Sequence, residues 1–176
     1  MIDGRIRALT SDTTKPTELA YAIRNYRATD FDRLWEIDQL CFPPGIAYTQ
    51  MELDGFLNHR NAITLVGEAV SADAEGDDLR RIAGFVVAHP VRRKYGRILT
   101  LDILPQARRS GLATKLMHVC EERLHALGCG EIYLETAVNN EPAIRLYRKL
   151  GYQVLGTIPD YYSSHSLDAY QMAKQL

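Results

Sequence analysis

The sequence predicts a single α/β domain in which helices flank a mixed, mostly antiparallel β-sheet. Three observations lead to this fold class. The chain has 176 residues, the size of one domain around one core. Its first half carries short segments rich in Val, Ile and Phe between polar turns, as in antiparallel sheets. After Pro105, helix-like and strand-like segments alternate.

The first half begins with a strand at 21–27, where apolar and polar residues alternate loosely. We therefore interpret residues 1–20 as a flexible N-terminal tail and residues 21–176 as the folded domain. An acidic loop at 71–78 separates two apolar segments and predicts a hairpin. The other predicted elements of this half are helices 31–40 and 49–57 and strands 62–70, 81–89 and 97–104.

In the second half, segments with the apolar spacing of a helix alternate with segments that have the two-residue alternation of a strand. An apolar stripe at helical spacing covers 113–127 and predicts a helix that Gly128 closes. Residues 131–138 alternate from one face to the other, as in a strand. Asn140 can cap the next helix and Gly151 can end it. Two further strands, at 152–157 and 167–173, close the sheet.

Composition excludes several classes of protein. With 46% hydrophobic and 24% charged residues the chain is neither disordered nor collagen-like. A net charge of −1 provides no general attraction to nucleic acid or anionic lipid. The longest apolar stretch, 82–88, is too short for a transmembrane helix. Three cysteines without a CxxC pair fit neither a disulfide framework nor a zinc site, so we expect a cytoplasmic protein.

The most informative stretch is 101–114, where a strand runs through a short loop into a helix. Amides at a helix start, together with the helix dipole, bind anions. Gly111 and Ala113 let a phosphate approach the backbone, and Arg108 and Arg109 add positive charge. The spacing matches neither a Walker A loop nor a dinucleotide-binding fingerprint. The stretch therefore predicts another kind of phosphate loop.

The sequence R-x-x-G-x-A at 108–113 resembles the acyl-CoA pyrophosphate loop, Q/R-x-x-G-x-G/A, of the GNAT superfamily of N-acetyltransferases. Residues Asn140 to Tyr152 resemble a second signature of that superfamily, N-x-x-A-I-x-L-Y-x-x-x-G-F/Y, and the two motifs occur in the expected order. The resemblance covers about 21–173. It implies the GNAT fold, in which the sheet is splayed between its fourth and fifth strands around the thioester.

Within the superfamily, the chain looks like the RimI-type group, the ribosomal-protein-alanine acetyltransferases. The residues concerned are C-F-P-P at 41–44, L-E at 134–135, D-Y-Y at 160–162 and D-A-x-x-M at 168–172. Leu167 departs from the group, which usually carries an acidic residue there. The group acetylates protein N-termini. The resemblance thus implies acetyl-CoA as co-substrate, no metal, and a protein or peptide N-terminus, including that of a ribosomal protein, as partner.

The resemblance also implies two catalytic residues. The acceptor amine attacks the thioester directly in a ternary complex, with Glu135 as general base, directly or through water. Tyr147 occupies the position of the tyrosine that protonates the CoA thiolate. Each residue has a structural alternative. Glu135 can pair with a cation on the sheet surface, and Tyr147 can be a core residue of an amphipathic helix.

Acetyl-CoA is expected between the splayed strands and the helix that follows the loop. By resemblance, backbone groups of Leu101, Asp102 and Ile103 pair with the pantetheine amides, and an amide near Ile103 can stabilise the oxyanion. Asn140 either bonds the pantetheine or only caps its helix. The other expected contacts of acetyl-CoA are Arg108, Arg109, Ser110, Gly111, Leu112, Ala113, Thr114 and Tyr147.

The acceptor is expected between two segments of the chain. Residues 43–48, among them Pro43 and Tyr48, form one wall. Tyr161 and Tyr162, placed by the sequence in a loop before the last strand, clamp the acceptor backbone in the RimI-type group. A tyrosine pair in a turn can equally serve packing alone.

The sequence therefore predicts an acetyl-CoA-dependent N-acetyltransferase that modifies N-terminal α-amines. Two alternatives remain open. One is acetylation of a small amine, such as a polyamine, an amino acid or an aminoglycoside. The other is a non-catalytic acyl-CoA sensor, against which the presence of both Glu135 and Tyr147 speaks. The sequence makes no prediction of oligomeric state.

Overall fold

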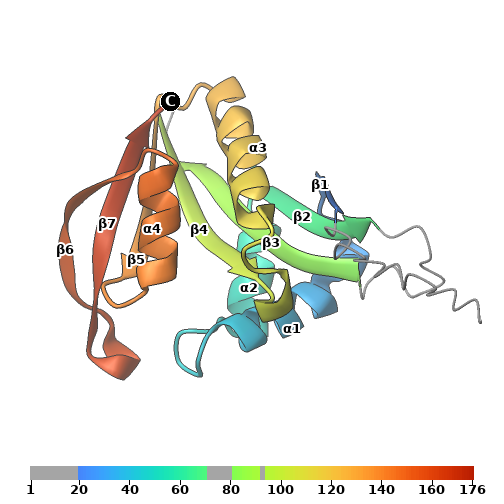
Figure 1. The fold of residues 1–176 in the computed structure, drawn as a ribbon, viewed down its shortest axis with the longest axis horizontal. Helices are drawn as coiled ribbons and strands as arrows, with labels where there is room; N and C mark the ends of the chain where they lie inside the picture. The colour runs from blue at the N-terminus through green and yellow to red at the C-terminus, as the bar shows by residue number, and fades with distance from the viewer. Residues whose placement is uncertain (1–19, 71–80, 92–93) are drawn as a thin grey trace, which may run out of the picture.

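The structure is a computed structural model that describes residues 20–70, 81–91 and 94–176. Within these ranges the chain forms a seven-stranded sheet and four α-helices (Figure 1). The strands are β1 (Ala20–Asn25), β2 (Ile63–Val70), β3 (Ile82–Val91), β4 (Tyr95–Ile103), β5 (Glu131–Ala137), β6 (Gln153–Tyr162) and β7 (Leu167–Gln175). The helices are α1 (Phe31–Cys41), α2 (Gln50–Leu57), α3 (Leu112–Ala126) and α4 (Glu141–Lys149).

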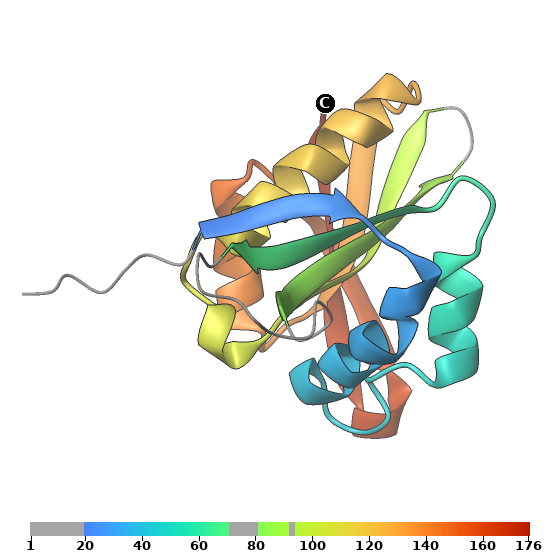
Figure 2. The same ribbon diagram turned by 90° about the vertical axis from the view of Figure 1, so that its right-hand side faces the viewer.

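The strands follow the order β1-β2-β3-β4-β5-β7-β6. Every neighbouring pair is antiparallel except β4 and β5, which are parallel. Helices α3 and α4 cover one face of the sheet, and α1 and α2 lie on the other (Figures 1 and 2). The prediction of a mixed, mostly antiparallel sheet with flanking helices is confirmed. The predicted tail, apart from Ala20, and the predicted loop at 71–78 lie outside the described residues.

Local sequence signals explain where the helices start. Thr49 and Glu52 form a capping box at α2, because the Thr49 side chain accepts the Glu52 amide and the Glu52 carboxylate accepts the Thr49 amide. At α4 the Asn140 Oδ1 accepts the Ala143 amide at 3.3 Å, and a proline stands in the first turn. Each helix therefore begins within one or two residues of its predicted start.

Two strand boundaries differ from the prediction. β6 runs to Tyr162, past Pro159, whereas the predicted strand ended at 157 and placed Tyr161 and Tyr162 in a loop. The register shifts between Ile158 and Tyr162, so a bulge absorbs the proline while the strand continues. Since β6 is an edge strand, a missing N–H costs little there. Likewise, the strand predicted at 81–89 extends through Pro90 to Val91 in β3. Pro90 pairs with Gly96, so β3 and β4 both continue into the stretch between the two predicted strands.

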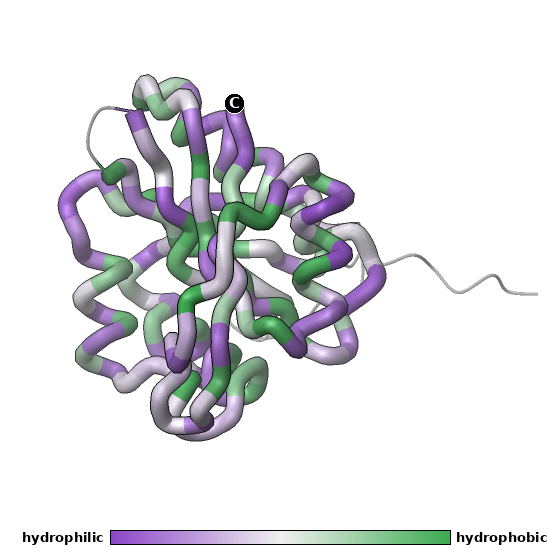
Figure 3. Tube along the Cα trace, turned by 90° about the vertical axis from the view of Figure 1, so that its left-hand side faces the viewer, coloured by the Kyte–Doolittle hydropathy of each residue, from purple (hydrophilic) through white to green (hydrophobic). Residues whose placement is uncertain are grey.

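The core lies between the sheet and the helices on both faces. Its largest fully buried side chains include Phe85 of β3, Leu34 of α1 and Leu116 of α3. Half-buried and buried residues alternate along β5, as expected where one face of a strand is buried, and Figure 3 shows hydrophobic and hydrophilic residues mixed along the strands on the side that it presents. No helix within the described ranges is long and apolar enough to span a membrane.

Candidate active site

The site is centred where β4 and β5 separate. These parallel strands pair only through Tyr95–Arg97 and Glu131–Tyr133. β4 then continues to Ile103 and β5 to Ala137 without further pairing between them. Figure 1 shows the two strands together near the C-terminus and apart at their other ends. The predicted splay between the fourth and fifth strands is confirmed.

The start of α3 forms the predicted phosphate loop. Gly111 is the N-cap, with φ +83°, a backbone conformation that other residues adopt at a cost. A Cβ at this position would meet nothing within 4 Å, so the space beside the loop is open. The Ser110 hydroxyl holds the turn by donating to the Ala107 carbonyl at 2.7 Å. The Leu112 amide donates to the Ser110 hydroxyl at 3.4 Å. Amides in the first turn of a helix have no partner within the helix, and Arg108 and Arg109 beside this turn are exposed, which suits a diphosphate.

Glu135 of β5 is bound by Arg97 of β4. The Arg97 Nε and Nη2 atoms donate to Glu135 Oε2 at 3.2 and 3.0 Å, and the Glu135 side chain is 8% exposed. Arg97 Nη2 also donates to the Tyr161 hydroxyl at 3.0 Å. The cation pairing expected as the alternative to catalysis is therefore present. Both Arg97 bonds end on Oε2, so the pairing fixes the carboxylate and leaves its other oxygen, Oε1, to accept a proton.

Tyr147 of α4 packs in the core with 7% of its surface exposed, edge-on against the Tyr152 ring at 5.8 Å. Burial raises the pKa of the Tyr147 phenol above its ordinary value, and the nearby charges of Tyr162 and Asp102 raise it further. The phenol therefore stays protonated at neutral pH. Its hydroxyl makes no hydrogen bond within the described residues, so it remains available as a proton donor. The core role and the site role are compatible.

The predicted pantetheine contacts have side-chain partners of their own. Asn140 caps α4, as one of the two alternatives expected. The Ile103 carbonyl accepts a hydrogen bond from Arg108 Nε at 3.1 Å and one from Cys41 Sγ at 3.4 Å. Leu101 is half-buried on the same part of β4, which pairs with β3 but not with β5. Farther along the chain, Leu112 is buried, and Ala113 and Thr114 are half-buried, in the first turn of α3.

Asp102 was predicted to contribute only backbone groups to the site, but its side chain also lies there. Its side chain is fully buried, and the Thr100 hydroxyl donates to Oδ1. The Oδ2 atom is buried without a partner in the described part of the chain. Burial raises the pKa of Asp102 well above its ordinary value, and the charge of Asp38 adds to this effect. The structure thus places a second carboxyl group beside the splayed strands.

Tyr48 reaches β4 where that strand is irregular. Ile98 and Thr100 pair with consecutive residues of β3, so Leu99 between them is an extra, bulged residue. The Tyr48 hydroxyl donates to the Leu99 carbonyl at 3.2 Å. Burial raises the pKa of Tyr48, and so do the charges of several neighbours, Asp102 first among them. The bulge therefore anchors the segment predicted as one acceptor wall.

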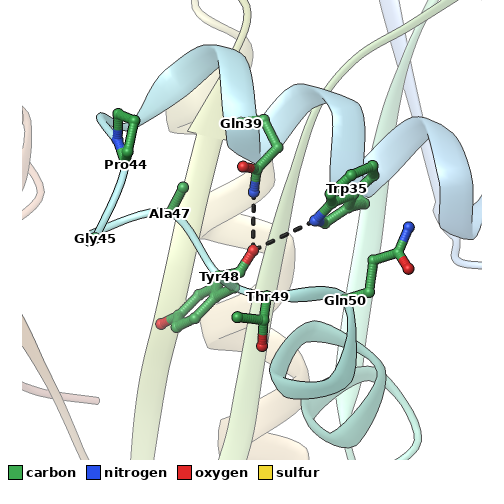
Figure 4. A pocket seen from close by; sticks show the side chains of 8 residues that line it. All are labelled: Trp35, Gln39, Pro44, Gly45, Ala47, Tyr48, Thr49 and Gln50. Atoms are coloured by element: carbon green, nitrogen blue, oxygen red, sulfur yellow. Dashed lines mark hydrogen bonds between the residues drawn. The ribbon is translucent and has the colours of Figure 1, made fainter.

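An open pocket of about 490 Å³ lies between the end of α1 and the start of α2 (Figure 4). Most of the segment predicted as an acceptor wall lines this pocket, including Pro44 and Tyr48, while Pro43 is not among its lining residues. Pro43 instead closes the turn, since its carbonyl accepts the amides of Ile46 and Ala47 at 3.0 Å each. The lining residues are Trp35, Gln39, Pro44, Gly45, Ala47, Tyr48, Thr49 and Gln50.

The other predicted acceptor wall is the end of β6 and the turn after it. Tyr161 and Tyr162 lie in the last two positions of β6, not in a loop, and their rings meet edge-on at 4.9 Å. Next to them, the Ser164 hydroxyl donates to the Gly45 carbonyl at 2.9 Å. This bond brings the two predicted acceptor walls, far apart in sequence, into contact.

Sequence reasoning missed Arg97 and Asp38. Arg97 stands in a mostly apolar strand, and a half-buried cation there requires a counter-ion. Asp38 stands directly after Ile37 in the predicted helix, and both side chains are buried. A charged residue on the apolar face of an amphipathic helix was the available signal. Within the described residues, no group of three or more His, Cys, Asp or Glu side chains could hold a metal.

Comparison with known proteins identifies the family. Residues 31–152 match the acetyltransferase (GNAT) family. A protein of Sulfurisphaera tokodaii named N-alpha-acetyltransferase is 34% identical over 160 residues, which cover 89% of this chain and 93% of the relative.

Solved structures share the fold. Ard1 from Thermoplasma volcanium superposes with a TM-score of 0.75 at 26% identity, covering 90% of this chain and 99% of that one. NAA60 from Arabidopsis thaliana in complex with acetyl-CoA gives a TM-score of 0.77 at 21% identity, covering 89% and 100%. The family match over residues 31–152 and the 34% identical relative show that the chain belongs to the acetyltransferase (GNAT) family, and the splayed strands and the phosphate loop agree with this.

Proposed function

We propose that this N-acetyltransferase transfers the acetyl group of acetyl-CoA to the N-terminal α-amine of a protein or peptide. The observation that carries the proposal is the opening between β4 and β5, with the phosphate loop on β4's side and Glu135 on β5. The name N-alpha-acetyltransferase of the 34% identical relative supports the acceptor class. A ribosomal protein in the cytoplasm is the acceptor that the RimI-type resemblance suggests.

The residues present fit acetyl-CoA, which supplies the activated acetyl group and a thiolate leaving group. The amides in the first turn of α3 and the two exposed arginines would hold the diphosphate. The unpaired edge of β4 at Leu101 to Ile103 would bond the pantetheine amides, once the Arg108 and Cys41 side chains leave the Ile103 carbonyl.

Proton transfer is assigned to two side chains, one on β5 and one on α4. Glu135, oriented by Arg97, takes a proton from the acceptor amine on its Oε1 atom, directly or through a water molecule. Tyr147, whose phenol is protonated at neutral pH, gives a proton to the leaving thiolate. Tyr48 on one side and Tyr161 and Tyr162 on the other would then hold the acceptor backbone.

The test is thiol release from acetyl-CoA with peptides that begin with Ala, Ser, Met or Gly, alongside polyamines and free amino acids. We expect turnover on peptides, with a preference for the first residue. Glu135→Gln and Tyr147→Phe should each lower kcat by ~10² while acetyl-CoA binding survives. Glu131→Gln is the matched control, because Glu131 is a half-buried glutamate at the paired end of the same strand.

Each alternative predicts a different result. Turnover on small amines alone would show a small-amine acetyltransferase and refute the N-terminal acceptor. Acetyl-CoA binding without thiol release from any amine, unchanged by Glu135→Gln, would show a sensor.

A further inference from the structure

Asp38 is a buried carboxyl group of α1 to which the chemistry above gives no role. Its side chain is 0% exposed. Its Oδ2 atom accepts the Tyr48 amide at 2.8 Å and Gln39 Nε2 at 3.0 Å, while Oδ1 is buried without a partner in the described part of the chain. Since a carboxylate is costly to bury, its retention at this position calls for a reason.

Its main contact is with Tyr48, which is held at three points. Asp38 accepts the Tyr48 amide. The Tyr48 carbonyl accepts Gln39 Nε2 at 2.8 Å and Trp35 Nε1 at 3.3 Å, as Figure 4 shows. The Tyr48 hydroxyl donates to the bulged Leu99 of β4. Helix α1 thus fixes the backbone of Tyr48, and β4 fixes the tip of its side chain.

The charges around Asp38 are all negative or neutral. The charge of Glu52 on α2 raises the pKa of Asp38. The charge of Asp38 in turn raises the pKa of Asp102 on β4 and that of the Tyr48 phenol, in the segment between α1 and α2. No cation acts on Asp38 among the residues that the structure describes. Burial raises the pKa of Asp38 to about 6, so it changes charge just below neutral pH.

We propose that Asp38 is a positioning residue for the acceptor site: its ionised carboxylate holds the Tyr48 segment against β4, and loss of that charge weakens acceptor binding without affecting acetyl-CoA. An amide bonds an ionised carboxylate more strongly than a neutral group, so the wall is firmer when Asp38 is charged. This inference rests on the proposed function, because it takes Tyr48 as part of the acceptor wall.

The test compares Asp38→Asn with the wild-type protein on an accepted peptide between pH 5.5 and 7.5. The expected ratio of acceptor KM, variant over wild type, rises from about two at pH 5.5, where about a quarter of Asp38 is still ionised, to about five at pH 7.5. Taking the ratio cancels the titration of the peptide amine. We expect kcat and the acetyl-CoA Kd to stay within about twofold, and Asp32→Asn, an exposed change of the same charge on α1, to give a ratio of one throughout. A ratio for Asp38→Asn that does not change with pH would overturn the proposal.

A second measurement does not depend on catalysis. The Tyr48 amide resonance in a ¹⁵N-labelled protein should titrate with a midpoint near the pKa of Asp38, about 6, and this titration should be absent in Asp38→Asn. A Tyr48 amide that does not titrate in the wild type would refute the positioning role. If no peptide is acetylated but the amide titrates as expected, the proposed function fails while the contact between Asp38 and Tyr48 stands.

Discussion

A carboxyl group that is 0% exposed, such as that of Asp38, is costly to ionise. Its pKa in the folded protein is about 6, above the ordinary 3.8, so folding favours the protonated form. The wild type therefore keeps its full stability below about pH 4 and loses part of it as the pH rises through 6.

Because the pKa of Asp38 is raised in the folded protein, we expect Asp38→Asn to be about 1–3 kcal/mol more stable than the wild type at pH 8 and nearly equal to it at pH 4. Urea unfolding at the two pH values measures the difference. A variant that is less stable than the wild type at pH 8 would contradict the assignment. Asp38→Asn would then be more stable but bind the acceptor more weakly, which is the trade-off between stability and activity expected where a buried charge serves function.

The conformation of the phosphate loop at the start of α3 depends on Gly111. Gly111 has φ +83° in open space, so the strain of a larger residue comes from the backbone alone. We expect Gly111→Ala to lower the free energy of unfolding by about 1 kcal/mol and to weaken acetyl-CoA binding. Thermal unfolding and calorimetric titration with acetyl-CoA provide the two measurements.

Gly55 supplies the matched control for that change. It lies inside α2 with helical geometry, and a Cβ there also meets nothing within 4 Å. Gly55→Ala should therefore stabilise the protein by about 0.5–1 kcal/mol and leave acetyl-CoA binding unchanged. If both alanine variants shift stability in the same direction, the conformational argument for Gly111 is wrong.

The whole sheet has a weak seam, because β1–β4 and β5-β7-β6 meet only through the short pairing of β4 with β5. Helix α3 packs on β2 and β3, and its Glu121 binds Lys174 of β7 at 2.6 Å, which ties the two halves together. The Glu121 side chain is 7% exposed. The ion pair therefore holds the halves together while the other ends of β4 and β5 stay apart.

Removing one partner would leave a buried charge unpaired. We expect Lys174→Met to lower the free energy of unfolding by about 2–3 kcal/mol, measured by urea denaturation. The control is Arg145→Gln, which breaks the exposed pair with Glu141 and should cost less than about 0.5 kcal/mol. Equal losses in the two variants would show that the seam is not supported by Lys174.

The sequence by itself determined the order and type of the elements, because hydrophobic periodicity and caps such as Thr49 and Asn140 are local signals. It also determined the family and the phosphate loop, since a backbone bend at Gly111 and the amides after it lie within a few residues of each other. The continuation of β6 through Pro159 was missed, because pairing with β7 outweighs the local turn signal.

Only the tertiary structure decided which side chains meet. Arg97 and Glu135 are 38 positions apart, and Tyr161 lies 64 positions from Arg97, so no local pattern could pair them. The same holds for the bond between Tyr48 and Leu99, which depends on a bulge in β4 that only pairing with β3 reveals. Ionisation states follow from burial, and burial is set by how the helices pack on the sheet.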